Sequence, residues 1–166
     1  RFLRLRSFIT MGKFLKPGRV VVVTSGRYAG KKAVIVKCYE EGTNQRKFPH
    51  AIVAGLDRAP QKITRKMSAR KIKKRSHVKP FYRFMNLNHI LPTRYVTDIE
   101  VKKVDIESGA SIELNEETLG NEDATLRASV KAALKKEFEN GYQTQNERKS
   151  AKNNEGTKFL MTRLRF

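Results

Sequence analysis

The chain has few of the residues on which redox and metal chemistry depend. Its 166 residues include one cysteine, Cys38, and no tryptophan. A single cysteine excludes an intrachain disulfide and a zinc site built from cysteine pairs. We expect Cys38, which lies in an apolar stretch that predicts a strand, to be a small buried side chain. No apolar run approaches the roughly 20 residues of a membrane-spanning helix, so we expect no membrane attachment.

Acidic residues are almost absent from the first 97 positions. Residues 1–97 contain 24 Lys and Arg against three Asp and Glu, residues 98–123 contain two against nine, and residues 124–166 contain ten against four. The formal net charge of +20 is extreme for this length, because a compact chain of one sign repels itself. We infer a polyanionic partner, with two basic regions flanking one acidic insert.

Catalytic signatures are also missing. The spacing of His50, His77 and His89 is not that of metal ligands, and the dense carboxylates are confined to the insert. Residues 26–32 resemble a phosphate-binding P-loop, but three residues instead of four separate the glycines, and Lys32 stands where that loop needs Ser or Thr. We expect no enzyme activity, cofactor, small-molecule substrate or self-association. Structural Mg²⁺ that accompanies RNA is compatible with this prediction.

A glycine-punctuated basic hairpin at residues 16–36 is the most informative segment that is present. Two β-branched runs, residues 20–24 and 33–36, predict buried strands. Gly26 and Gly30 permit a tight loop between them. The loop offers cations, one aromatic face and bare backbone amides, which suit an RNA backbone and its bases. This pattern resembles the KOW module, a small-barrel signature of ribosomal proteins and transcription elongation factors.

Short strands that follow the hairpin favour a small, partly closed antiparallel barrel. Residues 48–54 predict a third strand, and residues 61–64 predict a short fourth one. Residues 81–96 predict a further strand with a turn fixed at Pro92. Alternation from Ile99 to Ile106 predicts a strand within the acidic insert. The expected fold class is therefore mainly β with α: a small barrel with peripheral helices and extended basic termini.

Two helices are expected outside the barrel. In residues 65–79, which are rich in Lys and Arg and contain no acid, Ser68 can cap a short helix that Pro80 ends. Residues 121–123 predict the start of a second helix, and Asn140 with Gly141 predicts its end. Residues 144–157 are expected to be extended, and the apolar and basic residues 158–166 to insert between RNA helices.

The chain is thus expected to consist of six segments. They are a basic N-terminal extension (1–10), the barrel core (11–64), a basic helix with an aromatic and amide-rich segment (65–97), the acidic insert (98–123), an amphipathic helix (124–141) and an extended basic tail (142–166). Residues 1–10 precede a natural-looking start at Met11 and contain no acid. We favour an extension that lies on RNA over a transit-peptide fragment or an upstream artefact.

The candidate RNA contacts are cations, amides and one aromatic residue in these segments. They are Lys13, Lys16, Arg27, Tyr28, Lys31, Lys32, Lys62, Arg65, Lys66, Arg70, Lys71, Lys73, Lys74, Arg75, Lys79, Asn88, His89, Arg94, Lys158, Arg163 and Arg165. Lys and Arg would neutralise phosphates, and Tyr28 would stack on an exposed base. The acidic insert would be repelled by RNA and is expected to face solvent or a basic protein.

An ordered series of motifs resembles one family closely. The residues are 11–14 (Met-Gly-Lys-Phe), 16–18 (Lys-Pro-Gly), the glycine loop 25–37, and the segments 50–58, 88–95 and 164–166. Together they are similar to the eukaryotic large-subunit ribosomal protein family numbered twenty-seven. Residues 1–10, the stretch around 102–123 and the tail near 145–157 depart from the family pattern.

The resemblance implies a Src-homology-3-like barrel and a non-catalytic role in the cytosolic 60S subunit. Implied partners are large-subunit rRNA and neighbouring ribosomal proteins, and the implied localisation is the cytoplasmic ribosome after a nucleolar assembly stage. The alternative is a KOW-containing transcription elongation or nucleic-acid accessory factor. Such a factor would carry further barrel copies or a polymerase-binding domain, for which 166 residues leave no room.

Overall fold

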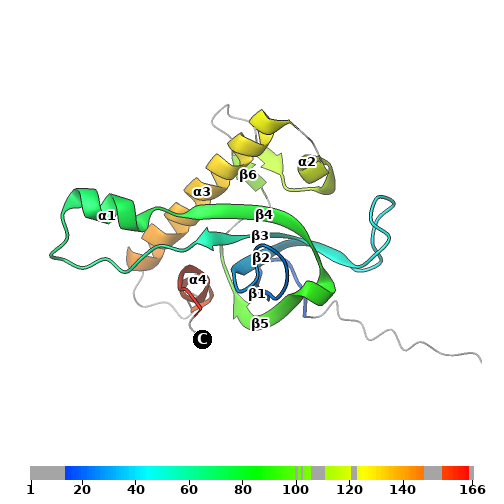
Figure 1. Cartoon of the computed structure of the whole chain (residues 1–166), viewed down its shortest axis with the longest axis horizontal. Helices are drawn as coiled ribbons and strands as arrows, with labels where there is room; N and C mark the ends of the chain where they lie inside the picture. Colours follow the sequence, from blue (N-terminus) through cyan, green and yellow to red (C-terminus); the bar gives the residue numbers. More distant parts are fainter. Residues whose placement is uncertain are drawn as a thin grey trace, which may run out of the picture.

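Five antiparallel strands form a curved sheet at the centre of the molecule (Figure 1). The computed structural model describes residues 14–99, 101, 103–105, 111–120, 123–147 and 155–164. The strands are β1 (Arg19–Val23), β2 (Lys32–Tyr39), β3 (His50–Arg58), β4 (Lys79–Asn86) and β5 (Ile90–Val96). Their order in the sheet is β4-β3-β2-β1-β5, so β4 and β5, which are consecutive in the chain, are the two edges. The expected small barrel with peripheral helices is confirmed.

The first hairpin has the predicted form. β1 and β2 pair antiparallel, with Val20 opposite Val34 and Val22 opposite Lys32. The loop between them is closed by hydrogen bonds from the Gly30 amide to the Val23 carbonyl at 2.7 Å and from the Val23 amide to the Lys31 carbonyl at 2.9 Å. Gly26 and Gly30 have φ angles of 85° and 74°, a region that side chains with a Cβ avoid.

Both faces of the central strands are buried, which explains their unbroken apolar runs. On the inner face of the curve, Val21, Val23, Ile35, Val53 and Phe81 belong to one apolar cluster. Alternate residues of the same strands face outward and pack with residues of two helices in a second cluster. Strands covered on both sides do not show the polar alternation of a half-exposed sheet.

The predicted strand at residues 61–64 is wrong. These residues form an irregular connection, and β4 occupies the edge of β3 along its length, from His50 opposite Asn86 to Arg58 opposite Lys79. β4 supplies Phe81 and Tyr82 to the core, whereas residues 61–64 offer one apolar side chain, Ile63. The sheet therefore draws its last two strands from the segment 65–97.

The turn is not at Pro92. A short 3₁₀ helix, η2 (Leu87–His89), separates β4 from β5, and the Asn86 side-chain oxygen accepts a hydrogen bond from the Asn88 amide at 2.9 Å. Pro92 lies within β5 opposite Val21. A proline has no amide proton to donate, and an edge strand tolerates this on its unpaired side.

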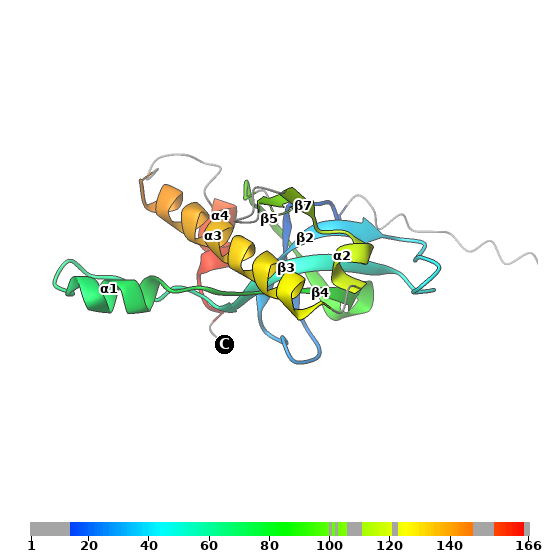
Figure 2. The same cartoon turned by 90° about the horizontal axis from the view of Figure 1, so that it is seen from above.

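The arm, residues 59–78, leaves the sheet between β3 and β4 and carries helix α1 (Ala69–Ser76). Figure 2 shows α1 at the far end of the arm, away from the sheet. The helix begins after Ser68 and ends before Pro80, as predicted, although the Ser68 side chain makes no capping hydrogen bond. No residue of α1 is buried.

The acidic insert contains the two-stranded sheet of β6 (Lys103–Asp105) and β7 (Ser111–Glu113), followed by α2 (Glu116–Gly120). The predicted strand is therefore shorter than residues 99–106. The next helix, α3 (Ala124–Glu147), starts where expected but does not end at Gly141. A Cβ at Gly141 would lie 2.8 Å from Ile99 Cδ1. The glycine thus provides close packing instead of a helix stop.

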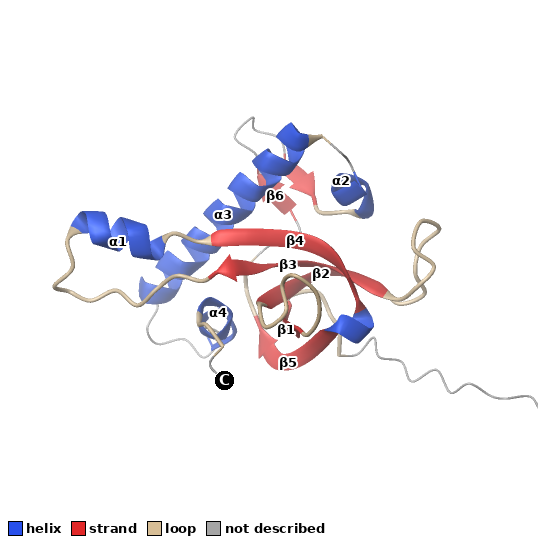
Figure 3. Cartoon of the chain, viewed as in Figure 1, coloured by secondary structure: helices blue, strands red, loops and turns tan. Residues whose placement is uncertain are grey.

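The prediction of an extended tail is wrong for the described residues, and the insertion of residues 158–166 between RNA helices stays a prediction. Helix α4 (Glu155–Met161) packs beside α3 and β5, on the face of the sheet that α3 covers (Figures 1 and 3). Leu160 and Met161 are buried in the outer apolar cluster, and Phe159 stacks on Tyr95 with ring centroids 4.4 Å apart. The apolar residues of this segment thus belong to the protein's own core.

Candidate nucleic-acid interface

The glycine loop presents fewer free groups than the sequence suggested. Arg27 is exposed. Tyr28 is half-buried and stacks on Phe81, with centroids 4.0 Å apart and ring planes 5° apart. One face of the Tyr28 ring is therefore occupied within the protein, and the guanidinium of Arg83 lies 5.9 Å from its centroid. Only the remaining face of the Tyr28 ring is open to stacking on a base.

Lys32 lies inside the protein, where it is 5% exposed. Its ammonium donates to the carbonyls of Phe159 and Thr162 at 2.5 and 2.7 Å and to Thr162 Oγ1 at 3.2 Å. It also lies 3.7 Å from the centroid of the Phe159 ring. Burial lowers the pKa of Lys32 to about 8. We therefore correct the interpretation of Lys32 as a phosphate contact: it holds the end of α4 against the hairpin.

Asp57, at the end of β3, is bracketed by two cations. Lys31 Nζ is 3.5 Å and Lys79 Nζ is 3.1 Å from its carboxylate, and Lys31 also donates to the Asp57 carbonyl at 2.6 Å. Burial raises the pKa of Asp57, but the hydrogen bonds and charges of Lys79 and Lys31 outweigh it and hold the pKa below its ordinary value. Lys31 and Lys79 are thus partly neutralised, although their side chains remain 40% and 65% exposed.

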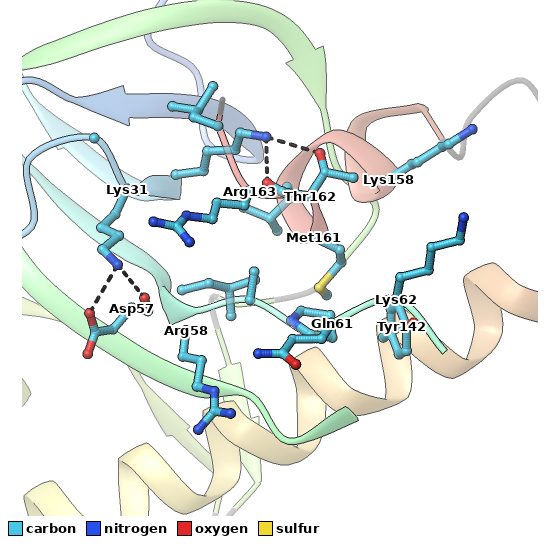
Figure 4. A pocket seen from close by; sticks show the side chains of 17 residues that line it. Lys31, Asp57, Arg58, Gln61, Lys62, Tyr142, Lys158, Met161, Thr162 and Arg163 are labelled. Carbon is cyan, nitrogen blue, oxygen red and sulfur yellow. Dashed lines mark hydrogen bonds and ion pairs between the residues drawn. The ribbon is translucent and has the colours of Figure 1, made fainter. Parts of the chain in front are cut away.

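A groove of about 1340 Å³ opens beside this pair, between the end of β3, the start of the arm, α3 and α4 (Figure 4). Its cationic lining residues are Lys31, Lys32, Arg58, Lys62, Lys158 and Arg163. Leu56, Pro60, Leu160 and Met161 supply apolar surface, and Tyr142 of α3 supplies an aromatic ring. The groove thus gathers candidate contacts from parts of the chain that are far apart in sequence.

The arm is the second basic surface. All of its candidate cations except Arg75 are exposed, and α1 has no acidic residue in its first turn. Arg75 is half-buried: its carbonyl accepts from the Gln61 amide at 2.9 Å, and its guanidinium lies 3.8 Å from Met67 Sδ. Arg75 thus tethers the helix to the start of the arm at Gln61 and is not a fully exposed cation.

A third group lies at β5 and the turn that precedes it. Asn88 and His89 of η2 are exposed. Arg94 is exposed as well, and its guanidinium donates to the Tyr95 hydroxyl at 3.1 Å. That hydrogen bond and the charge of Tyr95 raise the pKa of Arg94.

The candidate contacts therefore fall into three classes of placement. The exposed ones are Lys16, Arg27, Lys62, Arg65, Lys66, Arg70, Lys71, Lys73, Lys74, Lys79, Asn88, His89, Arg94, Lys158 and Arg163. Tyr28, Lys31 and Arg75 are half-buried, and Lys32 is buried. Lys13 and Arg165 lie outside the described residues. Sequence reasoning missed Arg58, an exposed groove cation, because as a lone Arg after a strand it belongs to no charge run.

The acidic insert partly faces its own chain. Glu116 of α2 accepts from the Thr43 hydroxyl at 2.7 Å and from the Arg46 guanidinium at 3.0 Å. The Thr43 hydrogen bond is the largest of the effects that lower the pKa of Glu116. The buried His50 ring has its Nε2 3.7 Å from the same carboxylate. This helix therefore holds the loop between β2 and β3, a role that the sequence reading did not foresee.

Other kinds of site find no support in the part of the chain that the structure describes. No group of three or more His, Cys, Asp or Glu side chains is arranged there to hold a metal ion. None of the helices described above is long and apolar enough to cross a bilayer. Burial and the charge of Glu40 raise the pKa of the half-buried Cys38 thiol, which disfavours the reactive thiolate.

Comparison with known proteins identifies a family for this chain. A family model described as the Ribosomal L27e protein family matches residues 20–166. The large ribosomal subunit protein eL27 of Tetrahymena thermophila is 49% identical over 159 residues, covering 94% of this chain and all of the relative. The large ribosomal subunit protein eL27B of Saccharomyces cerevisiae is 47% identical over 133 residues, which cover 80% of this chain and 90% of the relative. The eL27 of Caenorhabditis elegans is 42% identical over 156 residues, which cover 94% of this chain and all of the relative. The chain belongs to the Ribosomal L27e protein family.

Proposed function

We propose that this protein is a structural constituent of the large ribosomal subunit that binds and neutralises ribosomal RNA. The observation that carries the proposal is a set of exposed cations, on the groove and the arm, for which the described part of the chain supplies no counter-charge. Arg58, Lys62 and Arg163 on the groove form no ion pair with a described residue. The names of the relatives place those proteins in the large subunit, where the abundant polyanion is RNA.

The arm supports the proposal on energetic grounds. An eight-residue helix is marginal in water on its own, and α1 buries none of its residues. Its like charges repel one another at (i, i+3) and (i, i+4) spacing, since Arg70, Lys73 and Lys74 share one helix without an acid. A partner with negative charge would offset this repulsion and stabilise the helix.

The function proposed is non-catalytic. Binding would rest mainly on release of counterions from phosphates, which makes it independent of sequence and strongly dependent on salt. The proposed partners are large-subunit rRNA and neighbouring ribosomal proteins, and the proposed localisation is the cytoplasmic ribosome after nucleolar assembly. Mg²⁺ would enter as an ion bound by the RNA.

Sedimentation of the native chain tests the proposal. We expect the protein to migrate with 60S particles through a sucrose gradient and to remain with them through a wash at moderate salt. Migration at low molecular weight, or with transcription complexes, would contradict the ribosomal role and favour a nucleic-acid accessory factor.

A further inference from the structure

The groove combines a cationic margin with apolar and aromatic side chains. Binding of a phosphate backbone alone would require only the cations. Four cations at its margin, Arg58, Lys62, Lys158 and Arg163, form no ion pair with a described residue. The lining between them is mixed: Leu56, Pro60 and Met161 are apolar, Asp57, Gln61 and Thr162 are polar, and the half-buried ring of Tyr142 is aromatic. Figure 4 shows Tyr142 beside Lys62, with Lys158 and Arg163 projecting from the α4 segment.

The wall formed by α4 is firmly attached. Lys32 donates to two carbonyls at the end of the helix, and the hydroxyls of Thr97 and Thr157 are 3.1 Å apart in the core. Gly156 approaches β5 so closely that a Cβ there would overlap the Val96 carbonyl oxygen. These contacts fix the backbone from which Lys158 and Arg163 project, so that little backbone entropy is lost when a ligand enters.

Size and chemistry narrow the class of ligand. At about 1340 Å³, the groove exceeds the ~300–1,000 Å³ of typical small-molecule sites, which favours part of a polymer. The cations favour a polyanion. In an RNA duplex the base faces are stacked on one another, so a duplex would offer phosphates to the rim but no base face to the ring of Tyr142. An unpaired strand presents both phosphates and base faces.

We propose that the groove binds an unpaired RNA strand, with its phosphates on Arg58, Lys62, Lys158 and Arg163 and a base stacked on Tyr142. This inference rests on the proposed function and names the class of RNA that the groove would bind. The arm, which has cations but no buried apolar residue, would by contrast contact phosphates without regard to strandedness. An acidic protein segment is the competing occupant, because it matches the charge but lacks the base faces.

A tryptophan placed at the groove reports on this contact directly. The chain contains no tryptophan, so the Tyr142→Trp variant of the full-length protein has a single indole. We expect a single-stranded RNA 12-mer to quench its fluorescence, whereas a duplex of equal length and polyglutamate should leave it unchanged. Quenching by the duplex or by polyglutamate to the same extent would overturn the inference, as would no quenching by the single strand.

A matched pair of charge variants gives an independent measurement. Lys62→Ala with Arg163→Ala removes two groove cations, and Lys37→Ala with Lys47→Ala removes two exposed cations elsewhere. At equal net charge, the groove variant should lose about tenfold more affinity for single-stranded RNA than the control variant does. Equal losses would overturn the groove as the site of the strand.

Stacking itself is tested by two substitutions at one position. Tyr142→Phe should keep the affinity for the single strand, and Tyr142→Leu should lower it about fivefold or more. Equal affinity of the two variants would contradict stacking. If the wild-type chain sediments with 60S particles while these groove tests fail, the groove inference alone is wrong. If the wild-type chain does not sediment with them, the proposed function is wrong.

Discussion

Lys32 illustrates how a single residue can change its role once the fold is known. In the sequence it stands in a run of cations beside a glycine loop, which predicts a phosphate contact. In the structure its ammonium is buried among carbonyl oxygens that lie about 130 positions further along the chain. A cation near the last turn of a helix interacts favourably with the helix dipole. Lys32 therefore joins α4 to the hairpin.

Replacing Lys32 by methionine should destabilise the protein. The apolar side chain keeps the volume but leaves the carbonyls of Phe159 and Thr162 without a donor, which costs about 1–3 kcal/mol. The measurement is the free energy of unfolding by urea. Lys47→Met, at an exposed residue of the loop between β2 and β3, is the control and should change that free energy little. Equal effects of the two substitutions would contradict the role of Lys32.

Asp57 gives a prediction about pH. The pKa of Asp57 is lowered in the folded protein from its ordinary value of 3.8. The ionised carboxylate therefore stabilises the fold at pH values above 3.8, and this contribution is lost as the pH falls through the lowered pKa. The difference in unfolding free energy between the wild type and Asp57→Asn should therefore shrink as the pH is lowered from about 6 to about 2. A difference that does not depend on pH would contradict the pairing with Lys31 and Lys79.

At the scale of elements, the packing of α4 against β5 depends on Gly156, which has no side chain. Gly156→Ala would place a methyl group against the Val96 carbonyl, whose backbone cannot move without disturbing β5. We expect a loss of roughly 1–3 kcal/mol or more in unfolding free energy, as for other overpacked sites, and faster proteolysis at the C-terminal end. Gly120→Ala, where a Cβ meets nothing within 4 Å, is the control. Similar behaviour of the two variants would contradict the close docking of α4.

The exposed cations of the arm lead to a prediction about the salt dependence of RNA binding. Replacing Arg70, Lys71, Lys73 and Lys74 by alanine removes exposed cations from a helix without buried residues, so folding of the sheet should be unaffected. RNA binding should weaken, and the slope of log affinity against log salt should flatten by about 0.7–0.9 for each lost phosphate contact. The control replaces four exposed lysines elsewhere, Lys37, Lys47, Lys103 and Lys131. An unchanged slope in the arm variant would remove the arm from the RNA contact surface.

At the scale of the whole molecule, the sequence was sufficient for the central hairpin and for the fold class, but not for the last two strands of the sheet. β1 and β2 follow from local information: β-branched runs and two glycines that adopt positive φ. The start of α3 follows in the same way from residues 121–123, which precede the helix and include two acids. The family could also be recognised from sequence, because its motifs are short and ordered.

What sequence reasoning missed depends on contacts between distant segments. Gly141 is a helix stop by local rules, yet α3 continues through it to Glu147, and Ile99 packs where a Cβ would lie. The apolar residues of α4 show no helical signature in so short a segment, and their burial is decided by β5 and Lys32. The groove is formed by residues from about position 30 to position 164, so no linear pattern could have shown it.

The most direct measurement is ultraviolet cross-linking of the full-length chain within isolated large subunits, followed by identification of the linked peptides. If the protein is a structural RNA-binding constituent, peptides of the arm and of the groove margin should carry large-subunit rRNA nucleotides. Peptides of α2, whose Glu116 is engaged by Thr43 and Arg46, should carry none. Particles that contain the chain without any rRNA cross-link in the arm or the groove would contradict the proposed function.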